Sequence, residues 1–134
     1  DALIAAIDLL PTLCRACGID LKTISPSGPG IDGVDVWTTL IGRKGEAHPR
    51  NELLYWHGAD GFQAIRVGGW KLFLDRKNAQ LPGEGKGPAL FNLADEAGEL
   101  TDLSSRFPDR VRAMQELARK RLAEISEQTI PLGG

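Results

Sequence analysis

The 134-residue chain lacks the features that mark several protein classes. Its net charge is −2, without the basic excess that points to nucleic acid or the polybasic run that binds a membrane surface. No apolar stretch approaches the length of a membrane span. The first residues include no Met, no basic region and no cleavage pattern, so we do not expect a signal peptide there. We therefore expect neither nucleic acid nor a membrane as a partner.

What is present is ordinary for a folded domain. The apolar fraction is 42% and the charged fraction 25%, and a chain of this length can bury a core. Because it opens inside the apolar run 1–7, we expect a piece of something longer. A free-standing domain trimmed at its start is the alternative.

Cysteine and histidine are scarce, which limits metal and redox chemistry. Cys14 and Cys17 form a C-x-x-C pair, but zinc needs two more ligands, and His48 and His57 have no ligand-like spacing. A thioredoxin-like pair begins a helix after a strand, whereas this pair lies late in a predicted helix that ends at Gly18. We therefore expect core or near-core cysteines.

Short helices are predicted in the first third of the chain. The segment 8–18 is a helix in which Asp8 caps free N–H groups, and residues Leu9, Leu13, Ala16 and Cys17 share an apolar side. Residues 2–7 are predicted as a buried strand leading into it. A helical turn at 35–41 is capped by Asp35 and closed by Gly42.

The remainder predicts an α+β fold. Strand-like runs occupy 53–57, 62–67, 70–74 and 89–93. Gly68-Gly69 suits a tight hairpin turn between the second and third runs. The segment 108–126 has helical apolar spacing, with Pro108 at a favourable first position. We expect a four-stranded antiparallel sheet packed on one face by this C-terminal helix and preceded by short helices.

No complete active-site motif is present, so candidate residues are weighed one by one. His57 ends a strand near Asp60 and is either a cleft residue or a rim histidine satisfied by water or backbone. Arg66 suits a sulfate or carboxylate, but a structural role, paired with a local acid or packed on Trp70, is favoured. For Trp56 and Trp70 a core role is favoured over sugar stacking.

A metal site is a weaker possibility in the acidic stretch at Asp95, Glu96 and Glu99. Its spacing matches no known metal-binding loop, and we favour a solvated turn.

Four segments, in order, resemble the C-terminal end of the sulfatases. Residues 8–13 with Gly18-Ile19 resemble the pattern D-L-L-P-T-L…G-I, and residues 32–42 resemble D-G-x-S-L-x-P-L-L-x-G. Residues 50–74 resemble R-x-x-L-Y-W…A-x-R-x-G-x-W-K-L. Residues 90–103 resemble L-Y-D-L-x-x-D-P-x-E-x-x-N-L, with Asn92 and Ala97 departing from it. The likeness covers residues 8 to about 125.

The resemblance implies the alkaline-phosphatase-like superfamily and two domains. Residues 1–45 match the tail of the large α/β domain, and 46–134 match the C-terminal antiparallel subdomain. The whole enzyme is implied to use calcium and a formylglycine made within C/S-x-P-x-R. No catalytic or metal residue carries over, because neither Cys14 nor Cys17 is followed by the required Pro and Arg. Lys71 matches a structural or rim lysine.

The expected function is therefore that of a sulfatase C-terminal part. It buttresses the active site, contributes to a substrate rim, and has no activity by itself. The rim candidates are His57, Asp60, Arg66, Arg76 and Lys77. The implied partners are the missing N-terminal domain and a sulfated small molecule or glycan. The implied location is exported: periplasmic, extracellular or lysosomal.

Two alternatives stay open. The chain is otherwise a free-standing, non-catalytic binding module, or part of a related phosphodiester or phosphonate hydrolase. For a separated piece, residues 2–7 and Leu9-Leu10 are expected to be exposed, which would favour self-association.

Overall fold

The structure is a computed structural model that describes residues 2–24, 31–43, 49–58, 61–75, 81 and 87–128. The chain divides into two compact units, Asp1–Asn51 and Glu52–Gly134. The boundary predicted after residue 45 falls in the segment 44–48, which lies outside the described residues. That the first unit derives from a larger α/β domain stays a prediction.

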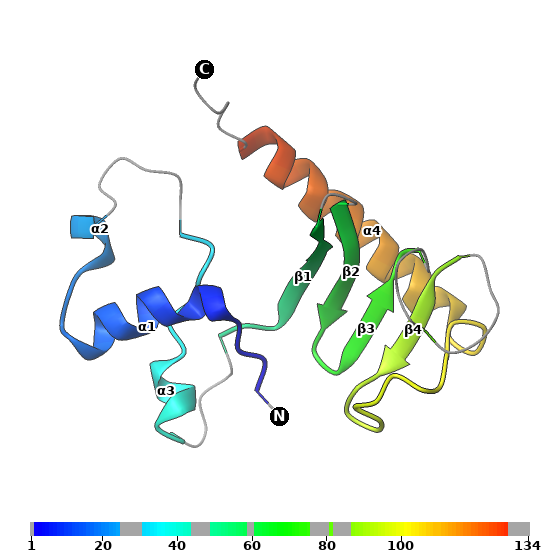
Figure 1. Ribbon diagram of the computed structural model, residues 1–134, viewed down its shortest axis with the longest axis horizontal. Helices are drawn as coiled ribbons and strands as arrows, with labels where there is room; N and C mark the ends of the chain where they lie inside the picture. Colours follow the sequence, from blue (N-terminus) through cyan, green and yellow to red (C-terminus); the bar gives the residue numbers. More distant parts are fainter. Residues whose placement is uncertain are drawn as a thin grey trace. The chain divides into compact units, whose positions relative to one another are not determined.

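The first unit consists of short helical segments. A 3-10 turn, η1 (Ala6–Asp8), leads into α1 (Leu9–Ala16), followed by α2 (Leu21–Ile24) and α3 (Trp37–Leu40) (Figure 1). Gly18 and Gly42 both take positive φ, as expected for closing positions. The cap position of α3 is Val36 and not Asp35 as predicted, although the Asp35 carboxylate still accepts from the Trp37 N–H at 2.8 Å.

Two expectations for this unit are wrong. Residues 2–7 form no strand, because the Asp8 N–H donates to the Ala5 carbonyl and the Ala5 N–H donates to the Asp8 carboxylate, which closes a turn instead. Asp8 does not cap α1, since its carboxylate is already engaged with other groups. Cys14 is buried as expected, whereas Cys17 is exposed, and both are free thiols.

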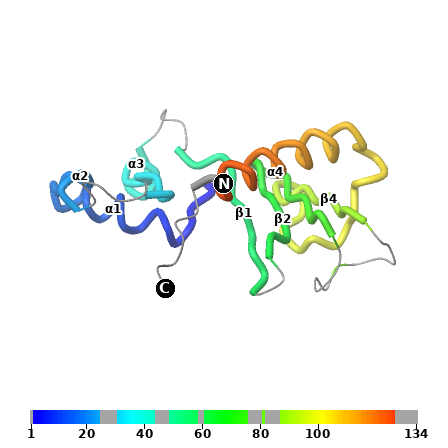
Figure 2. Tube along the Cα trace, turned by 90° about the horizontal axis from the view of Figure 1, so that it is seen from above, coloured from blue at the N-terminus to red at the C-terminus, as the bar shows by residue number. Residues whose placement is uncertain are grey.

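The second unit is a four-stranded antiparallel sheet in the order β1-β2-β3-β4, with one long helix on one face (Figures 1 and 2). Its elements are β1 (Glu52–His57), β2 (Gly61–Val67), β3 (Trp70–Phe73), β4 (Ala89–Asn92) and α4 (Pro108–Gln128). The α+β fold, the strands and the C-terminal helix are thus confirmed.

The core of this unit lies between the sheet and α4. The buried side chains from the sheet and the helix are Ile65, Leu72, Leu90, Val111, Met114 and Ala118. The opposite face of the sheet holds a smaller cluster of Ala64, Phe73, Ala89 and Phe91. The helical spacing read along 108–126 therefore marks the stripe that packs on the sheet.

A bulge interrupts the β1–β2 ladder. Tyr55 pairs with Ala64 and Trp56 pairs with Phe62, which leaves Gln63 without an opposing residue. The extra residue reverses the alternation of β2, so Phe62 joins the helix-side core although Ala64 belongs to the opposite cluster. Trp56 and Phe62 consequently lie together on one face.

Candidate functional site

The rim candidates do not assemble into one site within the described residues. His57 ends β1 opposite Gly61, whereas Arg66 pairs with Leu53 near the other end of that ladder. Five residues along β2 separate Gly61 from Arg66, or about 16 Å of strand. Asp60, Arg76 and Lys77 lie outside the described residues.

Within the described part of the chain, Arg66 takes neither of the structural roles weighed for it. Its Nε donates to the Gly68 carbonyl at 2.9 Å, which holds the guanidinium against the β2–β3 turn. It pairs with Lys71 across the two strands, as the two-residue turn at Gly68-Gly69 requires. Trp70 instead stacks with Arg110, whose Cζ lies 4.4 Å from a ring centroid, and packs edge-on against Phe107.

Lys71 is held by rings and a carboxylate. Its Nζ lies 4.6 Å from the Tyr55 ring centroid and 4.5 Å from that of Phe73, and donates to Glu99 Oε1 at 2.7 Å. Only 14% of the Lys71 side chain is exposed. Glu99 has a φ of 54°, an uncommon backbone state for a residue other than glycine. The ion pair between Lys71 and Glu99 thus links the segment after β4 to strand β3.

The acidic stretch that contains Glu99 is a hydrogen-bonded turn. Asp95 accepts from the Asn92 side-chain amide, and Glu96 accepts from the Thr101 N–H. Among the residues that the structure describes, no three His, Cys, Asp or Glu side chains are grouped so that they could hold a metal ion. The family resemblance places the calcium ion of the whole enzyme outside this segment, and we derive no step through that ion.

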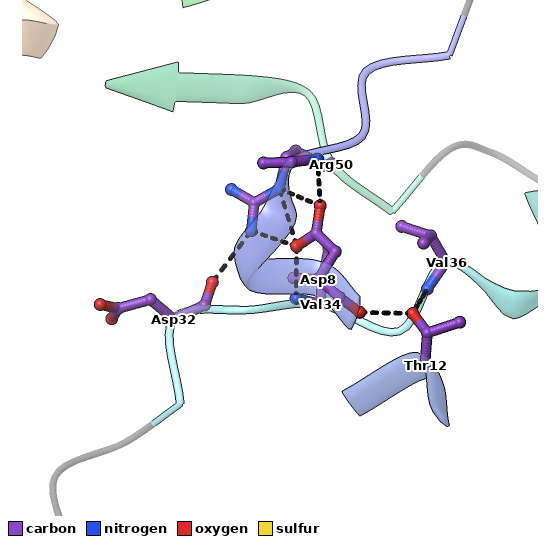
Figure 3. Close-up of polar contacts among 7 residues, drawn as sticks. Asp8, Thr12, Asp32, Val34, Val36 and Arg50 are labelled. Atoms are coloured by element: carbon purple, nitrogen blue, oxygen red, sulfur yellow. Dashed lines mark hydrogen bonds and ion pairs between the residues drawn. The ribbon is translucent and has the colours of Figure 1, made fainter. Parts of the chain in front are cut away.

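The Asp8 carboxylate, which the sequence predicts as a helix cap, lies instead at the centre of a hydrogen-bond network (Figure 3). Asp8 is fully buried and accepts from Arg50 Nε and Nη2 at 2.5–3.0 Å, and from the N–H of Ala5 and Val34 at 2.9 Å each. Arg50 Nη2 also donates to the Asp32 carbonyl at 3.0 Å.

Opposing effects act on the Asp8 carboxyl. Burial raises its pKa, but the Arg50 hydrogen bond, the two backbone N–H groups of Val34 and Ala5, and the Arg50 charge together outweigh burial. The pKa therefore lies below its usual range, and Asp8 is a carboxylate at neutral pH. A carboxylate whose acceptor sites are filled in this way has a structural role, with no lone pair left for proton transfer.

Thr12 extends this network into α1. Its hydroxyl donates to the Asp8 carbonyl at 2.5 Å and accepts from the Val36 N–H at 3.0 Å (Figure 3). The signal for the cluster was present in the sequence, since Asp8, Thr12 and Arg50 all fall in the family-like segments. Nothing in the sequence, however, indicates that residues 42 positions apart are paired.

The helix α1 presents its apolar side outward. Asp8, Pro11 and Thr12, which are spaced to lie on one side of the helix, are buried. Leu9, Leu10 and Leu13 are 53%, 47% and 60% exposed, and Ile4 and Ile7 before the helix are 39% and 47% exposed. The expected exposure is confirmed for Leu9-Leu10 and for Ile4 and Ile7, whereas Leu3 in the same stretch is buried.

None of the helices in the described part of the chain is long and apolar enough to cross a bilayer.

Comparison with known proteins supplies the context for these features. No protein-family model matches the chain. Arylsulfatase K of Danio rerio is 26% identical over 123 residues, covering 87% of this chain and 21% of that protein. Arylsulfatase G of Rattus norvegicus is 28% identical over 130 residues, covering 88% of this chain and 24% of that protein.

Solved structures share the fold. The PsFucS1 sulfatase from a Pseudoalteromonas species superposes with a TM-score of 0.73 at 21% identity, over 100% of this chain and 28% of that one. A second match, with a TM-score of 0.66 at 21% identity over 90% of this chain and 25% of that one, comes from work on the metabolism of multiple glycosaminoglycans by Bacteroides thetaiotaomicron. The chain thus spans only about a quarter of the length of these relatives. Over nearly its whole length, it matches the C-terminal part of a sulfatase.

Proposed function

We propose that the chain works as the C-terminal part of a sulfatase, a sulfuric ester hydrolase, in which it supports the active-site domain and contributes to the substrate rim. The calcium ion and formylglycine of that enzyme would be supplied by a preceding domain. The substrate would be a sulfated small molecule or glycan, and the location of the enzyme exported.

The observation that carries this proposal is the outward apolar side of α1. The polar side of the helix is fixed by the buried Asp8 and Thr12, so the helix is not free to turn its leucines inward. Burying the exposed part of Leu9, Leu10 and Leu13 is worth about 1 kcal/mol for each side chain. A partner surface that covers these leucines is therefore favoured. The relatives are about four times as long as this chain, and their remaining length is one candidate for that surface.

The polar groups of the described part also favour a supporting role. Asp8 is paired with Arg50 in the first unit, and Lys71 is paired with Glu99 in the second. Because these charged groups are held in ion pairs, we expect that the 134-residue chain alone does not hydrolyse sulfate esters.

Activity measurements test the proposal. We expect the purified 134-residue chain with calcium to leave an aryl sulfate intact, and the product of its whole reading frame to hydrolyse it. Turnover by the 134-residue chain would contradict the non-catalytic role. Activity of the whole product only on phosphodiester or phosphonate esters would instead favour the related-hydrolase alternative.

Light scattering tests the surface. We expect concentration-dependent self-association of the 134-residue chain through α1, reduced in the Leu9→Glu/Leu13→Glu variant. Leu100→Glu is a matched control, because Leu100 is 69% exposed and lies in the second unit. A clean monomer for the unaltered chain would instead support the free-standing binding module.

A further inference from the structure

The aromatic rings of the sheet are covered to different extents. The Lys71 ammonium lies over the rings of Tyr55 and Phe73, and the Trp70 ring packs against Arg110 and Phe107. Trp56 is 52% exposed, so the core role that the sequence favoured for it is wrong.

Trp56 is exposed because it lies beyond the part of the sheet that α4 covers. Arg121 of α4 donates to Glu52 at the start of β1 at 2.6 Å. Trp56 lies four residues further along the same strand, about 13 Å away, on the same face. In Figure 2, β1 runs away from α4 toward its C-terminal end. The helical layer therefore ends before it reaches the indole.

The indole is nevertheless held in place. Its ring centroid lies 5.5 Å from that of Phe62 at an interplanar angle of 66°, an edge-to-face contact. Such a contact covers at most one face of the indole, and the side chain as a whole is 52% exposed. Phe62 reaches this position only because the bulge at Gln63 moves it to the helix side. Bulges that re-aim a side chain are frequent next to functional sites.

The exposed surface is the size of one ring. The other large apolar side chains exposed in the described part of this unit are Leu100, Phe107 and Ile125, and none lies on the β1–β2 hairpin. A stable protein interface needs about 800 Å² from each partner, far more than one indole face. A small flat ligand suits it better.

We propose that Trp56, near the end of β1, binds a pyranose ring on its exposed indole. The indole face is electron-rich, and the C–H groups on one side of a pyranose carry partial positive charge, so the two attract while apolar area is removed from water. The proposal rests on the proposed function, in which the ring would belong to the sulfated glycan. His57 alternates to the opposite face and is not part of this site.

Binding to the 134-residue chain tests this without any hydrolysis. Methyl β-galactoside and a chondroitin disaccharide, each with and without sulfate, are titrated while NMR follows the indole N–H signals. We expect the Trp56 signal to shift while those of Trp37 and Trp70 stay in place, and saturation transfer to be strongest for the sugar C–H protons. Because the contact is with the ring, the unsulfated probes bind as well.

Variants separate stacking from other effects. Trp56→Ala is expected to weaken binding at least about tenfold, which corresponds to about 1.4 kcal/mol, while Trp56→Phe keeps most of it. Leu100→Ala, which removes an exposed apolar side chain elsewhere, is expected to change nothing.

Two results would overturn the proposal. One is the absence of a Trp56 shift with every probe at 50-fold excess. The other is a shift that follows only the concentration of the protein itself, which would make Trp56 a protein contact. Either result leaves the sulfatase proposal standing, since that is decided by the hydrolysis assay.

Discussion

Replacing Asp8 by Ala tests how much the buried Asp8–Arg50 ion pair stabilises the first unit. The change leaves the Arg50 guanidinium, whose side chain is only 10% exposed, as a buried charge without its carboxylate, and removes the acceptor of the Val34 N–H. Breaking a buried ion pair from one side costs about 3–5 kcal/mol. We expect a loss at the lower end, about 3 kcal/mol, because Arg50 keeps the Asp32 carbonyl.

Amide hydrogen exchange measures this loss within the first unit. The Val36 N–H is the best reporter, because its acceptor is the Thr12 hydroxyl, which the substitution leaves in place. A loss of about 3 kcal/mol accelerates its exchange about 100-fold. Leu72, in the second unit, is expected to be unaffected. Asp20→Asn is the matched control, since Asp20 is exposed and its carboxylate accepts from the Lys22 backbone N–H two residues on.

The reasoning fails if Val36 exchanges within about threefold of its original rate in the Asp8→Ala chain, the range of an ordinary surface change. A double-mutant cycle with Arg50→Met guards against unfolding of a single variant. If the pair is coupled as the geometry indicates, the double variant loses clearly less stability than the two single losses added together.

The pH dependence of stability, the effect of Gly33→Ala and the effect of Lys71→Met are further predictions. Because the folded pKa of Asp8 is lowered, its stabilisation is fully present above the unfolded value of about 3.9 and is lost as pH falls through the folded pKa; thermal melting below about pH 4 should show this, and less so in Asp8→Asn. In Gly33→Ala the new Cβ would lie 2.0 Å from the Ile7 carbonyl oxygen, so chemical denaturation should show a loss of about 3 kcal/mol. Lys71→Met leaves the Glu99 carboxylate unpaired on the sheet and should cost the second unit about 2 kcal/mol in urea denaturation, between the values for exposed and buried pairs; an unchanged midpoint would contradict the fastening role.

The sheet and α4 were predictable because their information is local. The short apolar runs separated by turn residues mark strands, and the spacing of Val111, Met114 and Ala118 marks one side of a helix. Gly68-Gly69 sets the connection between β2 and β3, and the pairing of Arg66 with Lys71 follows from that turn. Each of these inferences needs only residues that are close in the sequence.

The features that failed depend on distant parts of the chain. Strand alternation alone places Phe62 with Ala64, and only the pairing of β1 with β2 reveals the bulge that separates them. The exposure of Trp56 depends on where α4 ends its cover of the sheet. Asp8 has the position and residue type of a helix cap, but competition from Arg50 and Val34 decides its partners.

The buried pair and the exposed leucines of the first unit are two consequences of one arrangement. A surface helix of a folded domain normally lowers its free energy by facing its apolar side toward the core. In α1 that rotation would take Asp8 from Arg50 and Thr12 from the Val36 N–H, at a cost of several kcal/mol against about 1 kcal/mol gained for each leucine. The polar contacts therefore keep the apolar side outward whether or not it is covered. A helix stabilised in this way offers a partner a preformed surface, and in the proposed enzyme no refolding of α1 is needed when the domains pack together.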